Sequence, residues 1–376
     1  MKRLTLLEKK IIMQKPDSLH NYFGWPTLAR LQGGALAVAA SGFRFGHLCP
    51  FGKAVISYSY DEGATWTEPS AVIDTLLDDR DGGLLCFGES GVIYTSFNNS
   101  IAQQKKWVGD TEGARADYIR AYLALAEQYP EVEKEQLGAT MKFSRDGGMT
   151  WEKKIYRTAV STPHGPMIAP DGSVLYIGNV PGDLGRVECW RVNTDNGEMT
   201  KVGSVPQVEG GALPTDEVYG ISLKDGRILL VIRTEKQPEN PTWDNGYEMF
   251  TVYQCFSSDG GKSWTEPTLL PLAEGEDASP KNLGAPPHLY RDSKGRLILS
   301  TATRLPPFGI NILVSEDEGS SWRVYHLTDD APNADLGYPS TTELSDGSFY
   351  TAWYQHPDKN SPAVIYGARW RFEEDV

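Results

Sequence analysis

Cysteine is scarce in this sequence, with four residues among 376, and the four are widely spaced. None forms a CxxC pair or a short metal-ligand spacing, so we expect buried free thiols, no metal site and no other cofactor. Long apolar runs are also absent. The N-terminal MKRLTLLEKK places Glu8, Lys9 and Lys10 directly after LTLL, and no run reaches membrane-spanning length. We therefore expect a cytoplasmic protein without a signal peptide.

Positive charge is in deficit. The 36 Lys and Arg residues face 50 Asp and Glu residues, which gives a formal net charge of −14. A polyanion would be repelled, so the balance argues against a nucleic-acid or anionic-membrane partner. A small molecule or an oligosaccharide remains compatible, because a local basic pocket can lie inside an acidic shell. Association into a homo-oligomer stays open.

Turn formers and aromatic residues are abundant instead. The chain has 38 Gly, 24 Pro, 18 Tyr and 10 Trp, a composition typical of antiparallel β-structure. Four segments share the pattern Ser-x-Asp-x-Gly-x-Ser/Thr-Trp, and a fifth lacks the tryptophan. They are SYDEGATW (59–66), SRDGGMTW (144–151), SSDGGKSW (257–264), SEDEGSSW (315–322) and the weaker NTDNGEMT (193–200).

This repeat predicts a hairpin turn. Its Asp accepts hydrogen bonds from turn amides, its Gly takes a positive φ, and its Trp packs the turn onto a sheet. Short apolar runs such as DGRILLVIRT and KGRLILSTATR lie between the copies, separated by Asp-Gly or Lys-Gly turns. Such density of strands and turns indicates antiparallel sheets, at roughly 45 to 60 residues per blade.

We therefore predict an all-β fold: a six-bladed β-propeller of four-stranded antiparallel blades, occupying residues 1–376 as one domain. The N-terminal LTLLEKKIIMQ is expected to pair with the C-terminal VIYGARWRF and close the ring, which removes exposed sheet edges. A helical insertion at about 101–138 interrupts the pattern. Its apolar residues at helical spacing predict a helix from about 112 to 129, with a shorter turn after Pro130.

The repeat resembles the Asp-box of the sialidase (neuraminidase) superfamily, whose members are six-bladed propellers. The resemblance extends beyond the boxes. DEVYGISLKDGRILLVIRT supplies Glu217 and Arg233 in family order, and TATRLPPFGINILVSEDEG supplies Arg304 before a late box. GYPSTTELSDG places Tyr338 where the family has its nucleophilic tyrosine.

The resemblance implies a mechanism. A carbocation-like centre that bears a carboxylate repels an anionic nucleophile, so a neutral phenol activated by a carboxylate is better suited. Glu217 is then the base that takes the proton as Tyr338 attacks. Arg233 and Arg304 hold the substrate carboxylate by charge-assisted bonds.

The sequence departs from the family at two places. Gly24 stands where the first arginine is expected, followed by Trp25, and the late glutamate that supports this arginine is missing. The loop SGFRFGHLCPFGK (41–53), where the general-acid aspartate is expected, has no acidic residue. Arg44 matches an arginine often found before that aspartate, and we expect it to bind substrate. His47 is the one group in this loop suited to proton transfer near neutral pH.

A charged cluster, DDRDGG, follows the first blade. Carboxylates gathered around one arginine can raise the pKa of one carboxyl group for acid catalysis, or they can bind a polar sugar. A solvated charged turn without a functional role would have the same sequence. Asp79 and Asp81 are the catalytic candidates here, and Arg80 is a substrate-binding candidate. His164 and His288 each lie beside proline at an expected strand start, where they contact sugar hydroxyls or serve packing.

We predict an exo-acting glycoside hydrolase that cleaves a terminal acidic or modified sugar. Three alternatives remain open: a sialidase in the strict sense, a polysaccharide lyase in which Tyr338 and a histidine move protons beside a uronate, and a non-catalytic glycan-binding propeller.

Overall fold

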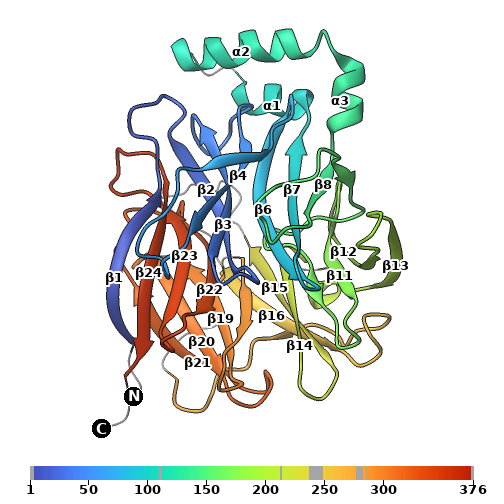
Figure 1. The fold of residues 1–376 in the computed structure, drawn as a ribbon, viewed down its shortest axis with the longest axis vertical. Coiled ribbons are helices and arrows are strands. Elements are labelled where there is room, and N and C mark those ends of the chain that lie inside the picture. Colours follow the sequence, from blue (N-terminus) through green and yellow to red (C-terminus); the bar gives the residue numbers. More distant parts are fainter. Residues whose placement is uncertain are drawn as a thin grey trace.

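The computed structural model describes residues 4–109, 112–211, 214–236, 249–276, 283–284 and 286–373. Within these residues the strands form six sheets, each of four antiparallel strands, and the sheets are arranged as blades around a common centre (Figure 1). The predicted six-bladed β-propeller is confirmed. Each blade takes its strands in chain order from the centre outward, and only the last blade departs from this order.

The first three blades are consecutive in the chain. The first contains β2 (Tyr22–Arg30), β3 (Leu36–Arg44), β4 (Lys53–Ser59) and β5 (Ser70–Ile73). The second contains β6 (Asp78–Phe87), β7 (Gly91–Asn99), β8 (Ala139–Ser144) and β9 (Tyr156–Arg157). The third contains β10 (Met167–Ile168), β11 (Val174–Val180), β12 (Asp183–Val192) and β13 (Met199–Ser204), and it is followed by the short 3₁₀ segment Val208–Gly211.

The remaining blades complete the ring. The fourth contains β14 (Val218–Ser222), β15 (Ile228–Lys236), β16 (Met249–Ser257) and β17 (Thr268–Leu269). The fifth contains β18 (His288–Arg291), β19 (Leu297–Thr303), β20 (Gly309–Ser315) and β21 (Arg323–Thr328). The sixth contains β22 (Gly337–Glu343), β23 (Phe349–Gln355) and β24 (Val364–Phe372), and its outer strand is β1 (Leu4–Met13).

The ring closes between the two ends of the chain, as the sequence predicts. β1 pairs antiparallel with β24, from Leu4 opposite Phe372 to Met13 opposite Ile365, and the two strands lie side by side in Figure 1. The sixth blade therefore joins strands more than 300 residues apart in sequence. This closure ties the last blade to the first and gives the outer edge of β24 a partner.

The four complete Asp-boxes form the predicted turns. In SSDGGKSW the carboxylate of Asp259 accepts hydrogen bonds from the Ser263 amide at 2.9 Å and the Ser263 hydroxyl at 2.5 Å. The Trp264 indole N–H donates to the Gly261 carbonyl at 3.1 Å. Gly261 has φ +91°, a value that favours glycine. These residues hold a turn at the blade edge and serve the fold.

Three helices rise over one end of the propeller between β7 and β8 (Figure 1). They are α1 (Ile101–Val108), α2 (Ala114–Ala126) and α3 (Pro130–Gln136). The helix predicted at 112–129 corresponds to α2, and α3 begins at the proline expected to interrupt it. Helix α1 was not predicted; it starts at a Ser100 N-cap whose hydroxyl accepts a hydrogen bond from the Gln103 amide at 3.1 Å.

All four cysteines are free thiols; Cys49, Cys189 and Cys255 are buried, as expected, whereas Cys86 is partly exposed. No helix in the described part of the chain has the length and apolar character needed to cross a bilayer.

Candidate functional site

The inner strands of the six blades all begin at the helix-bearing end of the propeller, and each blade presents one side chain there. In chain order these side chains are Trp25, Asp81, His164, Glu217, His288 and Tyr338. Five of the six belong to the set predicted from sequence, and the sixth, Trp25, follows the glycine at the expected arginine position. The site is thus a ring with one contribution from every blade.

Three of these residues sit on identical β-bulges. Trp25, Asp81 and Tyr338 have φ values of 56°, 57° and 55°, and at each of them two residues of the inner strand oppose one residue of the next strand. Proline follows Trp25 and Tyr338; it has no N–H to give to the ladder and suits a bulge. Gly82 follows Asp81, where a Cβ would lie 2.6 Å from the Ala40 nitrogen. The bulge redirects each of the three side chains toward the centre.

Tyr338, Glu217 and Arg233 form one hydrogen-bonded chain. The Tyr338 hydroxyl donates to one carboxylate oxygen of Glu217, and Arg233 binds the other oxygen. Tyr338 is 6% exposed, and the Glu217 side chain is 16% exposed. Burial and the charge of Glu217 raise the pKa of Tyr338 well above 10. The phenol is therefore neutral and already bonded to a group able to accept its proton.

Asp81 lies close to this pair. Its residue is 5% exposed, and the charges of Glu217, Arg80 and Arg44 act on its carboxyl. Burial, with a further contribution from the charge of Glu217, raises the pKa of Asp81 to about 8. Asp81 is accordingly a protonated carboxylic acid at neutral pH, beside a phenol and a carboxylate.

Arg304 approaches the same centre from the end of β19. Its Nε donates to the Leu336 carbonyl at 2.9 Å, and Nη2 lies 3.4 Å from the Tyr354 hydroxyl. Arg304 and Arg233 thus bring two guanidinium groups to one side of Tyr338. Such a pair suits a carboxylate ligand.

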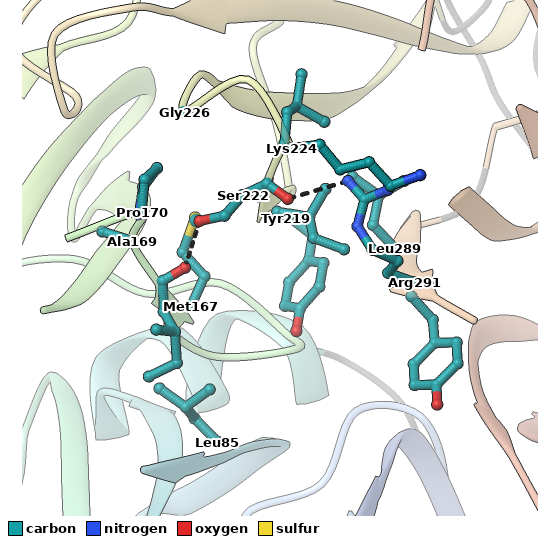
Figure 2. Close-up of a pocket in the computed structure, with 15 residues that line it drawn as sticks. Leu85, Met167, Ala169, Pro170, Tyr219, Ser222, Lys224, Gly226, Leu289 and Arg291 are labelled. Atoms are coloured by element: carbon teal, nitrogen blue, oxygen red, sulfur yellow. Dashed lines mark hydrogen bonds between the residues drawn. The ribbon is translucent and has the colours of Figure 1, made fainter. Parts of the chain in front are cut away.

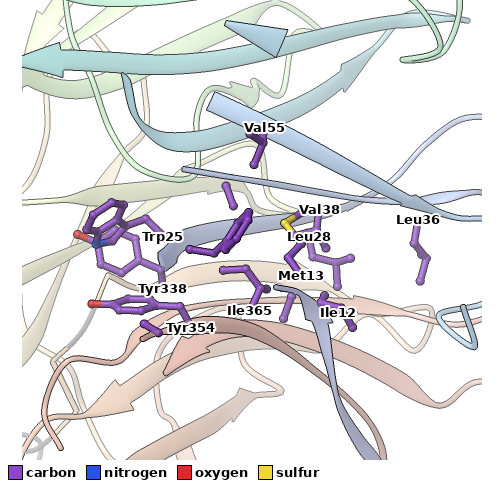
Figure 3. Close-up of a cluster of buried hydrophobic side chains, with 14 of the residues drawn as sticks. Ile12, Met13, Trp25, Leu28, Leu36, Val38, Val55, Tyr338, Tyr354 and Ile365 are labelled. Atoms are coloured by element: carbon purple, nitrogen blue, oxygen red, sulfur yellow. The ribbon is translucent and has the colours of Figure 1, made fainter. Parts of the chain in front are cut away.

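Trp25 packs beside Tyr338 and Tyr354. It is 1% exposed, and its ring lies 6.5 Å from that of Tyr338 and 6.0 Å from that of Tyr354. Figure 3 shows these three rings together at one end of a core cluster that continues through Leu28 and Met13. The indole therefore gives the site an apolar wall where the family resemblance anticipates an arginine.

Arg44 and Arg80 both lie against this indole, with their guanidinium carbons 4.9 Å and 4.0 Å from the ring centre. Arg44 is fully buried, and it donates to Asp78, to Ser41 and to the carbonyls of three loop residues. Arg80 also donates to the His47 carbonyl, at 3.0 Å. These bonds fix the loop that carries His47.

Asp335 joins four side chains behind the site. Its carboxylate accepts hydrogen bonds from Tyr22 at 2.9 Å and Tyr354 at 3.0 Å, and it pairs with His47 and His356 at 2.9 Å each. Burial alone would raise the pKa of Asp335, but the two histidines outweigh it and hold this pKa well below the usual value. We call Asp335 and these four partners the Asp335 hub. The hub fixes His47, whose ring lies 5.0 Å from Trp25.

Asp79 points away from this group. Its carboxylate accepts hydrogen bonds from the Thr75 amide at 2.7 Å, the Thr75 hydroxyl at 2.9 Å and Asn98 at 3.3 Å. Burial, against these bonds, raises the pKa of Asp79 to about 7. Residues two apart on a regular strand face the same side, but the bulge that begins at Asp81 turns this side chain toward the centre. The charged cluster is therefore divided between the loop before β6 and the central site.

His164 and His288 lie beside each other in the ring of site residues. Their rings are 5.0 Å apart, and the ring of His164 is 6.3 Å from that of Tyr338. Burial lowers the pKa of His164 to about 3 and that of His288 well below 6.5. Both imidazoles are therefore neutral at physiological pH.

Sequence reasoning missed the Asp335 hub and its partners Tyr22 and His356. One signal was available: Gly24-Trp25-Pro26-Thr27 and Gly337-Tyr338-Pro339-Ser340 repeat one pattern, Gly-aromatic-Pro-Ser/Thr. This internal repeat would have predicted that Trp25 and Tyr338 occupy equivalent positions on their blades. No comparable pattern marks Asp335, which lies in the loop before β22.

A separate hollow of about 590 Å³ lies at the other end of the inner strands. Figure 2 shows its wall, including Leu85, Met167, Tyr219 and Leu289, with Arg291 donating to the Ser222 carbonyl at 3.2 Å. None of the predicted site residues lines it.

Among the described residues, no group of three or more His, Cys, Asp or Glu side chains is arranged to hold a metal ion.

Comparison with known proteins places the fold. A family model described as BNR repeat-like domain matches residues 130–351, more than half of the chain. A search of curated proteins finds no match. A protein of unknown function from Dyadobacter fermentans is similar in structure, with a TM-score of 0.72 and 16% identity over 98% of this chain and 99% of that one.

Two characterised enzymes share the fold at low identity. The NanB sialidase from Streptococcus pneumoniae has a TM-score of 0.63 and 15% identity over 97% of this chain and 70% of that one. The alpha-L-arabinofuranosidase from Fusarium graminearum has a TM-score of 0.57 and 14% identity over 97% of both chains. The scaffold is thus common to propellers that act on different sugars.

Proposed function

Since this chain belongs to the BNR repeat-like domain family, with a sialidase-like propeller, we propose that it is an exo-acting glycoside hydrolase that removes a terminal acidic sugar from a glycan. One observation carries the proposal: the buried Tyr338 hydroxyl is hydrogen-bonded to Glu217, which is in turn bonded to Arg233. Tyr22 and Tyr354 also donate to a carboxylate, but theirs is the Asp335 carboxylate, which pairs with two histidines. The carboxylate partner of Tyr338 is bonded to an arginine instead.

In the proposed reaction the Tyr338 oxygen attacks the anomeric carbon while Glu217 takes the phenolic proton. The bond to the leaving oxygen breaks, and a glycosyl–tyrosine intermediate forms. Water then attacks the same carbon, gives one proton to the carboxylate of Asp81, which lost its own proton to the leaving oxygen in the first step, and releases the sugar as the proton held by Glu217 returns to the tyrosine. A neutral phenol is suited to this step, because a carboxylate nucleophile would be repelled by an acidic substrate.

Asp81 is the proposed general acid that protonates the leaving oxygen. The acid aspartate that the family resemblance anticipates is missing from residues 41–53, and Asp81 reaches the centre from the next blade. Its pKa of about 8 keeps the proton in place at neutral pH. His47 is assigned a positioning role, because the Asp335 carboxylate and the indole of Trp25 hold its ring.

Arg233 and Arg304 are the proposed partners of the substrate carboxylate. Two guanidinium groups remain where the family resemblance implies three, because the buried indole of Trp25, covered by Arg44 and Arg80, cannot form an ion pair.

The test is hydrolysis of a fluorogenic α-sialoside, a panel of aryl uronides and a panel of neutral aryl glycosides. Wild type is compared with Tyr338→Phe and with Tyr325→Phe, which removes the hydroxyl of another buried tyrosine on the outer strand β21. We expect cleavage of at least one acidic glycoside, lowered ~10³-fold or more by Tyr338→Phe and unchanged by Tyr325→Phe.

Two results would overturn the proposal. An ultraviolet-absorbing unsaturated product from a uronate polymer would indicate a lyase. No turnover of any substrate, with sugar binding retained, would indicate a glycan-binding propeller.

A further inference from the structure

A second hollow, of about 490 Å³, lies at the same end of the propeller as Tyr338, between the first blade and helix α2. We call it the insertion pocket. Its aromatic lining consists of Phe43, Phe51, Tyr118 and Tyr122, and its polar lining includes His20, Lys53 and Asp74. Neither the repeat pattern nor the site described above accounts for this pocket.

We propose that the insertion pocket binds a sugar ring of the glycan substrate on the leaving-group side of the scissile bond. The inference rests on the proposed function for its orientation, and on the pocket's own chemistry for the class of ligand. Stacked aromatic rings bordered by a few charged and hydrogen-bonding groups fit a pyranose, which offers CH faces to the rings and hydroxyls to the rim.

The aromatic wall is already formed. The rings of Phe51 and Tyr118 are stacked, with centroids 5.2 Å apart and planes inclined by 21°. Tyr122 lies 4.7 Å from Phe51 and donates a hydrogen bond to the Leu76 carbonyl at 2.8 Å. On the other side Gln136 accepts a hydrogen bond from the Leu76 amide at 2.7 Å. The insertion is thereby fastened to the loop before β6, so little ordering remains for a ligand to impose.

The rim supplies the polar contacts. Lys53 and Asp74 form an ion pair whose side chains are 36% and 48% exposed, so both keep access to a ligand. The Nδ1 atom of His20 lies 3.1 Å from the Phe43 carbonyl and must donate to it, which leaves Nε2 as an acceptor. A cation, a carboxylate and an acceptor nitrogen around one apolar wall can together bind several hydroxyl groups.

The chain fixes the distance to the proposed chemistry. Leu77 lines the pocket, and Asp81, the proposed acid for the leaving oxygen, is four residues further along the chain, on β6. Four extended residues span at most about 14 Å. The loop that carries Phe51 also carries His47, which touches Trp25. This distance is within the length of a short oligosaccharide, which would approach Tyr338 on the side of the acid.

Ligand-observed NMR tests the pocket without relying on turnover. Saturation transfer to 3′-sialyllactose, trigalacturonate, maltotriose and xylotriose is measured in a Tyr338→Phe background, so that no ligand is consumed. Tyr118→Ala is added to remove the stacked ring, Tyr118→Phe to restore it, and Tyr129→Ala as a matched control. Tyr118 and Tyr129 are 54% and 51% exposed, so neither substitution opens the core.

We expect transfer to at least one trisaccharide, weakened about 10-fold in affinity by Tyr118→Ala and retained in Tyr118→Phe and Tyr129→Ala. Saturation transfer to none of the four trisaccharides, or transfer unaffected by Tyr118→Ala, would overturn the proposal that the pocket binds a sugar. The two proposals fail separately. Hydrolysis of aryl glycosides without Tyr118-dependent binding leaves the hydrolase and removes the pocket. Tyr118-dependent binding without hydrolysis leaves the pocket in a glycan-binding protein.

Discussion

Trp25 and Tyr338 occupy equivalent positions on adjacent blades and pack edge to face, with ring centroids 6.5 Å apart and planes inclined by 72°. Each follows a glycine, precedes a proline and has a positive φ. For non-glycine residues this backbone conformation costs of order 1–3 kcal/mol. The same conformation recurs at Asp81. Four other described non-glycine residues with positive φ lie outside this ring, at Phe43, Glu62, Glu209 and Glu318. The three that meet at one centre mark a part of the molecule where geometry is maintained at the expense of stability.

Asp81→Asn should stabilise the protein, and the gain should depend on pH. Burial raises the pKa of Asp81 to about 8 in the folded chain, from 3.8 in the unfolded chain. The folded state therefore binds more protons between these values, and stability falls as the pH rises from about 4 to 8. The amide removes this loss. Urea denaturation should show a gain of roughly 2–4 kcal/mol at pH 7 and almost none at pH 4.

The matched control is Asp195→Asn, at an exposed turn, which should change stability at neither pH. An equal gain from Asp81→Asn at pH 4 and pH 7 would contradict a protonated native carboxyl. Loss of stability at pH 7 would mean that the carboxylate is ionised and paired.

The sequence predicts the architecture well because the architecture is local. Each Asp-box is closed by hydrogen bonds within eight residues, so the four copies show directly in the sequence where blade edges lie. The order Glu217, Arg233, Arg304 and Tyr338 along the chain also carries information, since each follows a recognisable turn or box. Helix α2 is similarly visible through its apolar spacing.

What the sequence could not provide is set by long-range packing. Asp335 and Tyr22 are 313 residues apart, yet their side chains share a hydrogen bond. The opposite directions of Asp79 and Asp81 depend on a bulge that begins after Arg80. A propeller brings six distant segments to one point, and no local pattern states which side chain each blade will turn inward.

His47 and His356 should titrate on opposite sides of pH 6.5, although both bind Asp335. Burial lowers the pKa of His47, with help from the Arg80 and Arg44 charges. Burial also acts on His356, but its hydrogen bond to Asp335 and the charge of that group outweigh it and raise the pKa. His356 therefore contributes stability below pH 6.5 that is lost as the pH rises through its folded pKa.

Histidine-selective NMR titration checks this pair. Asp335→Asn should lower the pKa of both rings, since it removes the shared negative charge. A pKa of His356 unaffected by the substitution would show that the ion pair does not form in solution.

Asp259→Ala should lower the free energy of unfolding by about 2 kcal/mol. The hydrogen bonds from Ser263 lower the pKa of Asp259 to about 2, and the substitution leaves these donors without their acceptor. Asp195 holds the same position in the weaker fifth copy, NTDNGEMT (193–200), and its carboxylate accepts no hydrogen bond in the described part of the chain. Asp195→Ala is thus the matched control and should be close to neutral in urea denaturation. Equal losses in the two variants would assign the effect to turn propensity.

Arg304→Lys should raise KM for an acidic substrate by ~10-fold or more and leave neutral aryl glycosides unaffected. The guanidinium uses Nε to hold the Leu336 carbonyl at 2.9 Å while its terminal nitrogens extend toward the site. A lysine keeps the charge but cannot anchor itself and hold a carboxylate by two parallel bonds. Arg296→Lys is the matched control, because Arg296 lies on the same blade, at the turn before β19, and pairs with Asp292 at 2.7 Å. A fall in kcat with KM unchanged would instead mean that Arg304 acts on Tyr338 in the transition state. An equal effect on acidic and neutral sugars would remove the carboxylate from the recognised features of the substrate.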